Sequence, residues 1–213
     1  MCWNAEVSFL TFTIGLITSF LLIYKGNPKY KKENIIFGIF FIFISLIQFF
    51  DFLFWIDIDN KYKINYYTTL IATIIKAGQP TILYLIKILF LEKSFLTPYN
   101  LFFLTLNILY AIYLLSKYIK FLNGGILKTS ISDKTNHLKW PWLKYFQSKP
   151  YYLIMFALNI LYLTNFNYSL FLFIITYFFL FLSYTYFKYN AGELWCFFGA
   201  FIPLIIYISS YFL

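Results

Sequence analysis

Long apolar runs separated by short polar turns constrain the fold of this chain more than any other feature of its sequence. A helix that crosses a bilayer needs about 20 mostly apolar residues, and six runs approach or exceed this length. A seventh, 151–163, is shorter. Because 62% of the 213 residues are hydrophobic and only 12% are charged, a water-soluble domain of this size could not bury the apolar side chains. The sequence therefore predicts an integral membrane protein.

The runs predict an all-α fold, a bundle of seven transmembrane helices in a single domain that covers residues 1–213. The expected spans are 5–24, 35–56, 66–91, 99–119, 151–163, 168–187 and 194–213. If the short fifth run is re-entrant, the number of spans falls to six. The one long connection, 123–150, alternates partly between apolar and polar residues on either side of DKTN. This pattern favours a small β-hairpin between the fourth and fifth helices.

The net charge of +9 reflects eight acidic residues against 17 basic ones, all of which are lysines. Because they are scattered through short loops, they are typical of residues that face phospholipid headgroups, so the expected partner is the lipid bilayer and not nucleic acid. The abundance of Phe, Ile, Lys, Asn and Tyr, which have AT-rich codons, indicates an AT-rich genome such as that of a large DNA virus. Lysines follow the first run and none precede it, which favours an N-terminus outside, in a host or virion membrane if the chain is viral. The lysines of the long loop, which then also lies outside, oppose this orientation.

Seven spans would gather the polar groups on the side of the N-terminus. Gln48 and Asp51 are three residues apart and share a helix face, at depths of about 12 and 7 Å below the helix end. Lys76 enters the third helix from the same side, to a depth of about 15 Å. Gln79 follows it, and Pro80 is expected to kink the helix there. Ionisable groups inside a membrane usually face a partner or a water-filled cavity.

We therefore expect a polar cavity that opens on the side of the N-terminus. Its expected lining is Glu6, Gln48, Asp51, Lys76, Gln79, His137 and Glu193. Lys76 and Asp51 are predicted to face each other across the second and third helices. The alternative is that Lys76 merely snorkels, that the glutamines bridge helices by hydrogen bonds, and that His137 lies on the hairpin surface. Trp140 and Trp142 have the pattern of interfacial anchors.

The only two cysteines, Cys2 and Cys196, each lie beside a tryptophan at the start of an apolar run. Seven spans place both at the same membrane surface, so the first and last helices are expected to pack as parallel neighbours. The two sulfurs could then form a disulfide if the geometry and an oxidising compartment allow it. The alternative is two unrelated buried thiols.

Several functional classes are excluded by missing residues. A single histidine cannot build a His-rich metal site from this chain, so no metal is predicted. The last apolar run has no lysine for a retinal Schiff base, and neither GxGxxG nor a Walker A motif is present. No cofactor is predicted.

Five short motifs together resemble one known family. They are MCWNAEVS, LIQFFDF, the QP of the third run, HLKWPW and GELWC. This set resembles an uncharacterised family of multi-pass membrane proteins from large DNA viruses, protists and bacteria that typically begin Met-Cys-Trp-Ser-Ala. Asn4 stands where the family has serine, which weakens a hydroxyl nucleophile at that position. The resemblance spans the whole chain and implies membership without an activity.

The sequence thus favours a protein that binds or translocates an unknown small molecule or ion, which requires a continuous polar path past Pro80. One alternative is an intramembrane lipid-modifying enzyme, with Asp51 or Glu6 as acid/base and Lys76 stabilising an anion. It requires reactive groups within hydrogen-bond reach. The other is a structural or assembly protein of a viral membrane, in which Lys76 and Asp51 pair in a dry core. The sequence does not indicate an oligomeric state.

Overall fold

The computed structural model describes residues 4–91, 97–132, 136–146, 149–162, 164–186 and 191–212. These residues are mostly helical, and the predicted all-α class is confirmed. The helices are α1 (Ala5–Lys25), α2 (Lys31–Ile56), α3 (Ile64–Leu91), α4 (Pro98–Gly124), α5 (Lys149–Leu161), α6 (Phe166–Tyr186), α7 (Ala191–Gly199) and α8 (Ile202–Ser209). Short 3-10 turns cover Pro28–Tyr30 and Pro141–Lys144, and the strands are β1 (Ser130–Ile131) and β2 (Leu138–Lys139).

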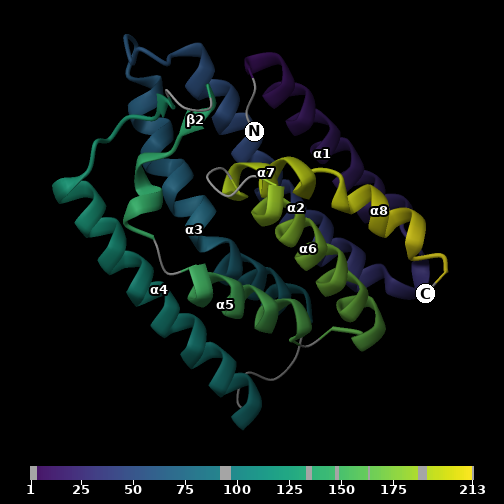
Figure 1. Cartoon of the computed structure of the whole chain (residues 1–213). Helices are drawn as coiled ribbons and strands as arrows, with labels where there is room; N and C mark the ends of the chain where they lie inside the picture. The colour runs from purple at the N-terminus through teal and green to yellow at the C-terminus, as the bar shows by residue number, and fades with distance from the viewer. Residues whose placement is uncertain are drawn as a thin grey trace.

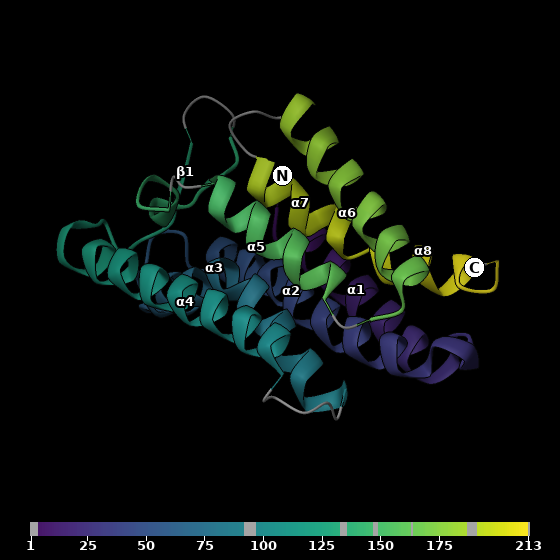
Figure 2. The same cartoon turned by 90° about the horizontal axis from the view of Figure 1, so that it is seen from below.

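Five of the described helices are long and apolar enough to cross a membrane, namely α1, α2, α3, α4 and α6. Helix α5 and the segment that holds α7 and α8 are shorter. Helix α4 packs mainly on α3 at the edge of the bundle (Figures 1 and 2). Its exposed apolar side chains include Leu101, Phe102, Ile108, Leu109, Ile112 and Leu115. Such a surface suits lipid and not water, which supports a membrane protein.

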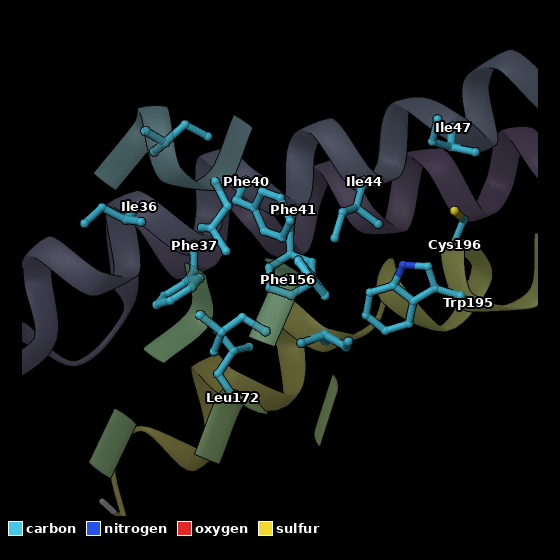
Figure 3. Close-up of a cluster of buried hydrophobic side chains, with 14 of the residues drawn as sticks. Ile36, Phe37, Phe40, Phe41, Ile44, Ile47, Phe156, Leu172, Trp195 and Cys196 are labelled. Carbon is cyan, nitrogen blue, oxygen red and sulfur yellow. The ribbon is translucent and has the colours of Figure 1, made fainter. Parts of the chain in front are cut away.

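Helix α2 is the centre of the bundle, because it contacts α1, α3, α7 and α8. It runs antiparallel to α1, as shown by ring contacts of Phe9 with Phe52 and of Phe12 with Phe49. A Cβ on Gly15 of α1 would collide with Ser45 of α2, so the missing side chain allows close helix packing. The core of α2 is apolar, with Ile36, Phe37, Phe40, Phe41 and Ile44 all buried (Figure 3).

The seventh apolar run forms two helices, and not the single helix expected from its hydropathy. Pro203 has no N–H, and its ring excludes the carbonyl of the residue four positions back, Gly199. Accordingly α7 ends at Gly199 and α8 begins at Ile202. The hydroxyl of Thr18 in α1 donates a hydrogen bond of 3.2 Å to the carbonyl of Ala200 in the break. Backbone that leaves the helix inside a membrane needs such a partner.

Helix α8 lies along the second half of α1 and runs in the same direction (Figure 1). At the end of this seam the Asn27 side chain donates to the carbonyl of Ser210 at 2.7 Å. The Tyr211 hydroxyl donates to the carbonyl of Lys25 at 2.8 Å. The first helix and the last segment are therefore parallel neighbours, as the sequence predicts.

The predicted β-hairpin is present and lies over the end of the bundle where α3 begins. Ser130 pairs with Lys139 and Ile131 with Leu138 in antiparallel register. The side-chain amide of Asn65 in α3 fixes the hairpin, because it donates to the carbonyl of Thr129 and accepts from its N–H, both at 2.9 Å.

Trp140 and Trp142 are not interfacial anchors, and that expectation is wrong. Their exposed fractions are 2% and 1%, and their rings stack with centroids 5.1 Å apart. Trp142 also contacts the ring of Phe54 in α2. The indoles are buried because the hairpin folds back over the bundle and carries them inward.

Asp57 begins the short turn between α2 and α3 and caps α3. Its Oδ2 accepts from the N–H of Ile64 at 2.8 Å and of Asn65 at 3.3 Å, and its Oδ1 accepts from the N–H of Tyr62 at 3.2 Å. Burial acts to raise the pKa of Asp57, but these bonds to the ionised carboxylate outweigh it and hold the pKa below its ordinary value.

Candidate functional site

Polar side chains from α2, α3, α5 and α7 meet inside the bundle at one level. A Cβ on Gly199 of α7 would lie 2.7 Å from Ile44 of α2, and the two helices are antiparallel. Cys196 is about one turn before Gly199 and Gln48 about one turn after Ile44, so Cys196 and Gln48 lie level with each other. Figure 3 accordingly shows Cys196 beside Ile47, with its sulfur toward α2.

Lys76 of α3 reaches this level and contacts the cysteine. Its Nζ donates to the Sγ of Cys196 at 3.2 Å and lies 5.8 Å from the ring centre of Tyr152 in α5. The thiol is fully buried, and sulfur is a weak hydrogen-bond acceptor. The ammonium group therefore has a close but weak partner.

Gln79, one turn after Lys76, is also fully buried. Its Oε1 accepts a hydrogen bond of 2.5 Å from the Tyr152 hydroxyl, while its Nε2 has no hydrogen-bond partner. The indole of Trp195 in α7 lies near the same hydroxyl, yet its Nε1 completes no hydrogen bond. The N–H groups of Gln79 Nε2 and Trp195 Nε1 are thus two buried donors that complete no hydrogen bond among the described residues.

Gln48 is the most unusual residue of the group. Its side chain is 1% exposed, and neither Oε1 nor Nε2 has a hydrogen-bond partner among the residues that the structure describes. Each buried polar group left unsatisfied costs about 1–3 kcal/mol, so a purely structural core position favours an apolar residue here. We call Gln48, Lys76, Gln79, Tyr152, Trp195 and Cys196 the central cluster.

Asp51 lies one turn from Gln48 toward the hairpin. Its Oδ1 accepts a hydrogen bond of 3.1 Å from the Nε1 of Trp140, and its charge and that of Lys76 both act on the Cys196 thiol. The hydrogen bond that the Lys76 ammonium makes to the described residues goes to the thiol, and the predicted pairing of Lys76 with Asp51 stays a prediction. Because α7 packs against α2, Cys196 lies close enough to both charged groups for each to act on its thiol.

The other residues predicted to line the cavity are not part of the central cluster, or they lie outside the described residues. Glu6 is exposed in the first turn of α1. His137 is half-buried on the hairpin, where burial lowers its pKa and its Nδ1 has no hydrogen-bond partner. The side chain of Glu193 and the whole of Cys2 lie outside the described residues, so the disulfide between Cys2 and Cys196 stays a prediction.

The donor set offers no evident metal site. Within the ranges that the structure describes, no three His, Cys, Asp or Glu side chains are grouped so that they could hold a metal ion.

A second buried lysine, Lys87, is not among the residues predicted from the sequence. Lys87 is fully buried in α3, and its Nζ donates to the carbonyls of Ile160 at 2.7 Å and Tyr162 at 2.8 Å. It also lies 5.1 Å from the ring centre of Phe37. The ammonium group therefore caps the C-terminal end of α5. Lys87 could have been recognised from the sequence, because it is a charged residue within the apolar stretch TILYLIKILFL. Tyr152 and Trp195 could not, because nothing distinguishes them from the many other aromatic residues.

One face of α3 is polar over much of its length. Its residues Asn65, Thr69, Thr73, Lys76 and Gln79 recur every three or four positions, the spacing of one helical face. Past Pro80, a reciprocal amide pair of Asn107 and Asn159 follows, and Asn159 donates to the Pro80 carbonyl at 3.0 Å. The buried side chain of Leu83 separates this region from Lys87.

The sequence matches no protein family and no curated protein, and no solved structure matches the fold. The resemblance to the family that begins Met-Cys-Trp-Ser-Ala therefore stays a prediction. The evidence for a function is therefore the arrangement of the central cluster.

Proposed function

We propose that this chain is a membrane protein that binds or translocates a small polar solute, and that the central cluster is its binding site. The observation that carries the proposal is the side-chain amide of Gln48, which is buried with neither atom hydrogen-bonded. Buried polar groups in proteins are nearly always paired with protein or ordered water. An amide with no partner among the described residues, level with a lysine and a thiol, is explained by a ligand or water that occupies the site.

The scaffold interpretation has less support. It requires Lys76 and Asp51 to neutralise each other in a dry core, but Lys76 donates to Cys196 and Asp51 accepts from Trp140. A scaffold also gains nothing from three unsatisfied polar side chains at one level.

The polar face of α3 supports translocation over binding alone. It leads from the hairpin side to the cluster and continues past Pro80 to the amide pair of Asn107 and Asn159. Two buried side chains close it, Trp140 above Asp51 and Leu83 before Lys87. We propose that the solute enters from the hairpin side, and that movement of Trp140 opens the site.

The decisive experiment is the accessibility of Cys196 in a Cys2→Ser background. In protein-containing vesicles, a small water-soluble thiol reagent is expected to modify Cys196, and Trp140→Ala is expected to speed the modification. The matched control is Ile36→Cys in a chain that lacks both native cysteines, because Ile36 is equally buried in the apolar core of α2. Equal rates for Cys196 and the control cysteine would contradict a polar site.

An intramembrane lipid-modifying enzyme is the second candidate, and the 3.2 Å contact between Lys76 Nζ and Cys196 Sγ favours it. In this version Cys196 is the nucleophile, in place of the expected acid/base role of Asp51 or Glu6. Incubation with a lipid ester should then transfer the acyl group to the Cys196 sulfur as a thioester, while the ester C–O bond breaks and its alcohol leaves with the thiol proton. The thioester is detectable as a mass increase of the intact protein that Cys196→Ser abolishes. A protein whose mass is unchanged excludes this covalent route.

We also propose that all seven apolar segments cross the membrane, with α7 and α8 forming one crossing together. The helix order then places the 26–30 turn and the hairpin on opposite sides. Cysteines introduced at Lys31 and Lys128, in a chain without native cysteines, should react with an impermeant reagent from opposite sides of sealed cells. Labelling of both from outside would exclude seven crossings, and labelling of Lys128→Cys alone would establish the predicted outside N-terminus.

A further inference from the structure

We infer that the central cluster recognises an oxyanion, such as a carboxylate or phosphate group. This inference rests on the proposed function and assigns the chemistry of its ligand. It follows from the hydrogen bonds that the cluster leaves open, which are nearly all donors.

The central cluster has more hydrogen-bond donors than acceptors that complete no hydrogen bond among the described residues. Trp195 Nε1 is a donor only, and although the Tyr152 hydroxyl lies near it, it completes no hydrogen bond among the described residues. Gln79 Nε2 is in the same condition, because the acceptor of that amide is occupied by Tyr152. Gln48 adds one open donor and the one open acceptor of these three side chains. The described contacts give the Lys76 ammonium, which has three N–H donors, one hydrogen bond, and that bond goes to sulfur.

Charge alone does not decide the ligand class. Lys76 and Asp51 have opposite charges near the same thiol, so their fields largely oppose each other. Hydrogen bonding does decide it, because Asp51 Oδ1 already accepts from Trp140, whereas side chains of α2, α3 and α7 at this level have N–H groups that complete no hydrogen bond among the described residues. A cation would find one amide oxygen and the Asp51 carboxylate there, beside the Lys76 ammonium that repels it, while an oxyanion would satisfy that ammonium and several N–H groups at once.

Lys87 shows that a buried lysine of this chain can have strong hydrogen-bond acceptors, unlike Lys76. Its ammonium donates to two backbone carbonyls and therefore offers a second anion no comparable set of donors. The oxyanion site is consequently confined to the half of α3 that carries Lys76.

The test is protection of Cys196 from a small maleimide in the Cys2→Ser protein, reconstituted in phosphatidylcholine vesicles. The probes are acetate and inorganic phosphate, with acetamide as the neutral match and methylammonium as the cationic one. Acetate or phosphate is expected to slow the modification saturably, and the other two are not. Protection by methylammonium, or by acetamide as well as acetate, would overturn the inference while leaving a polar site intact.

A lipid headgroup is a second source of the same chemistry. Vesicles that contain phosphatidylglycerol, without soluble oxyanions, test it. Protection by soluble probes identifies an aqueous solute, and protection by phosphatidylglycerol alone identifies a lipid. If neither slows a modification that otherwise proceeds, the oxyanion inference is wrong. If Cys196 does not react under any condition, the proposed function itself fails.

Variants separate recognition from folding. Gln48→Glu keeps the size of the side chain but adds a negative charge, and should abolish protection by oxyanions. Gln48→Leu and Lys76→Met should each weaken protection roughly tenfold, the effect of one lost hydrogen bond to a charged group. Lys120→Met is the control, because Lys120 is exposed on α4 and its loss should not change the protection. Unchanged protection in both Lys76→Met and Gln48→Glu would contradict the assigned site.

Discussion

Two lysines of the same helix are buried in different ways, and the difference separates structure from function. Lys87 is fully buried and donates to two carbonyls at the end of α5. Lys76 is half-buried and donates to a thiol, among amides that lack partners. A polar group whose hydrogen bonds are complete stabilises the fold. A polar group among neighbours whose hydrogen bonds are not all made is a candidate site for a ligand that would make them.

The largest expected effect comes from exchanging each lysine for methionine. Lys87→Met leaves the carbonyls of Ile160 and Tyr162 without their donor in the core, and should lower the free energy of unfolding by about 3 kcal/mol. Lys76→Met loses one weak bond to sulfur and should change it by less than about 1 kcal/mol. Denaturant unfolding of the two purified variants in the same detergent gives the comparison directly. Equal losses would remove the distinction between the two lysines.

The amide side chains offer the same contrast on a smaller scale. Asn159 bonds reciprocally to Asn107 and also to the Pro80 carbonyl, so Asn159→Leu leaves several buried groups unpaired. We expect a loss of about 2 kcal/mol, again from unfolding curves. Asn107→Leu in the background of Asn159→Leu should add little, because the two residues act as one unit. A full additive loss in the double variant would show that the pair is not coupled.

Asp57 extends the comparison to a buried carboxylate whose hydrogen bonds come from the backbone. Because its pKa is lowered in the folded protein, its stabilising contribution is fully present above the unfolded pKa of about 3.9. The contribution is lost as the pH falls through the lowered folded value. Asp57→Asn should therefore be less stable than wild type at neutral pH, and the difference in melting temperature should shrink below about pH 4. A difference that is constant with pH would assign the effect to packing.

The smallest effect should have the opposite sign. Gln48→Leu replaces two unsatisfied buried atoms by apolar ones, and should leave stability unchanged or raise it by up to about 1 kcal/mol. A melting curve without added solute is the measurement. A clear loss of stability would show that Gln48 has a structural partner, and it would weaken the proposed site.

Much of the fold follows from local patterns of the sequence. Apolar runs gave the helices, and alternation around DKTN gave the hairpin, because both depend on neighbouring residues. A proline such as Pro203 indicates a disturbed helix, but whether it bends or divides the helix depends on whether the freed backbone finds a partner. Here Thr18 of α1 provides it, and no local pattern contains that contact.

The candidate site was predictable only in part. Gln48, Asp51, Lys76 and Gln79 stood out because polar residues are rare inside apolar runs. Their partners did not, since Tyr152 is one of 21 tyrosines and nothing local to Cys196 indicates its contact with Lys76. Which residue completes a contact is decided by helix packing over long sequence separations.

The seam between α1 and α8 has a consequence for the order of assembly. Its hydrogen bond from Thr18 to Ala200 joins residues 182 positions apart, and contacts of such separation form late because the intervening chain must first be placed. Neither α7 nor α8 is long enough to cross a bilayer alone. During synthesis, α1 and α2 must therefore remain in the membrane with the face around Gly15 and Thr18 uncovered. The last segment should become stably inserted only when it packs on that face.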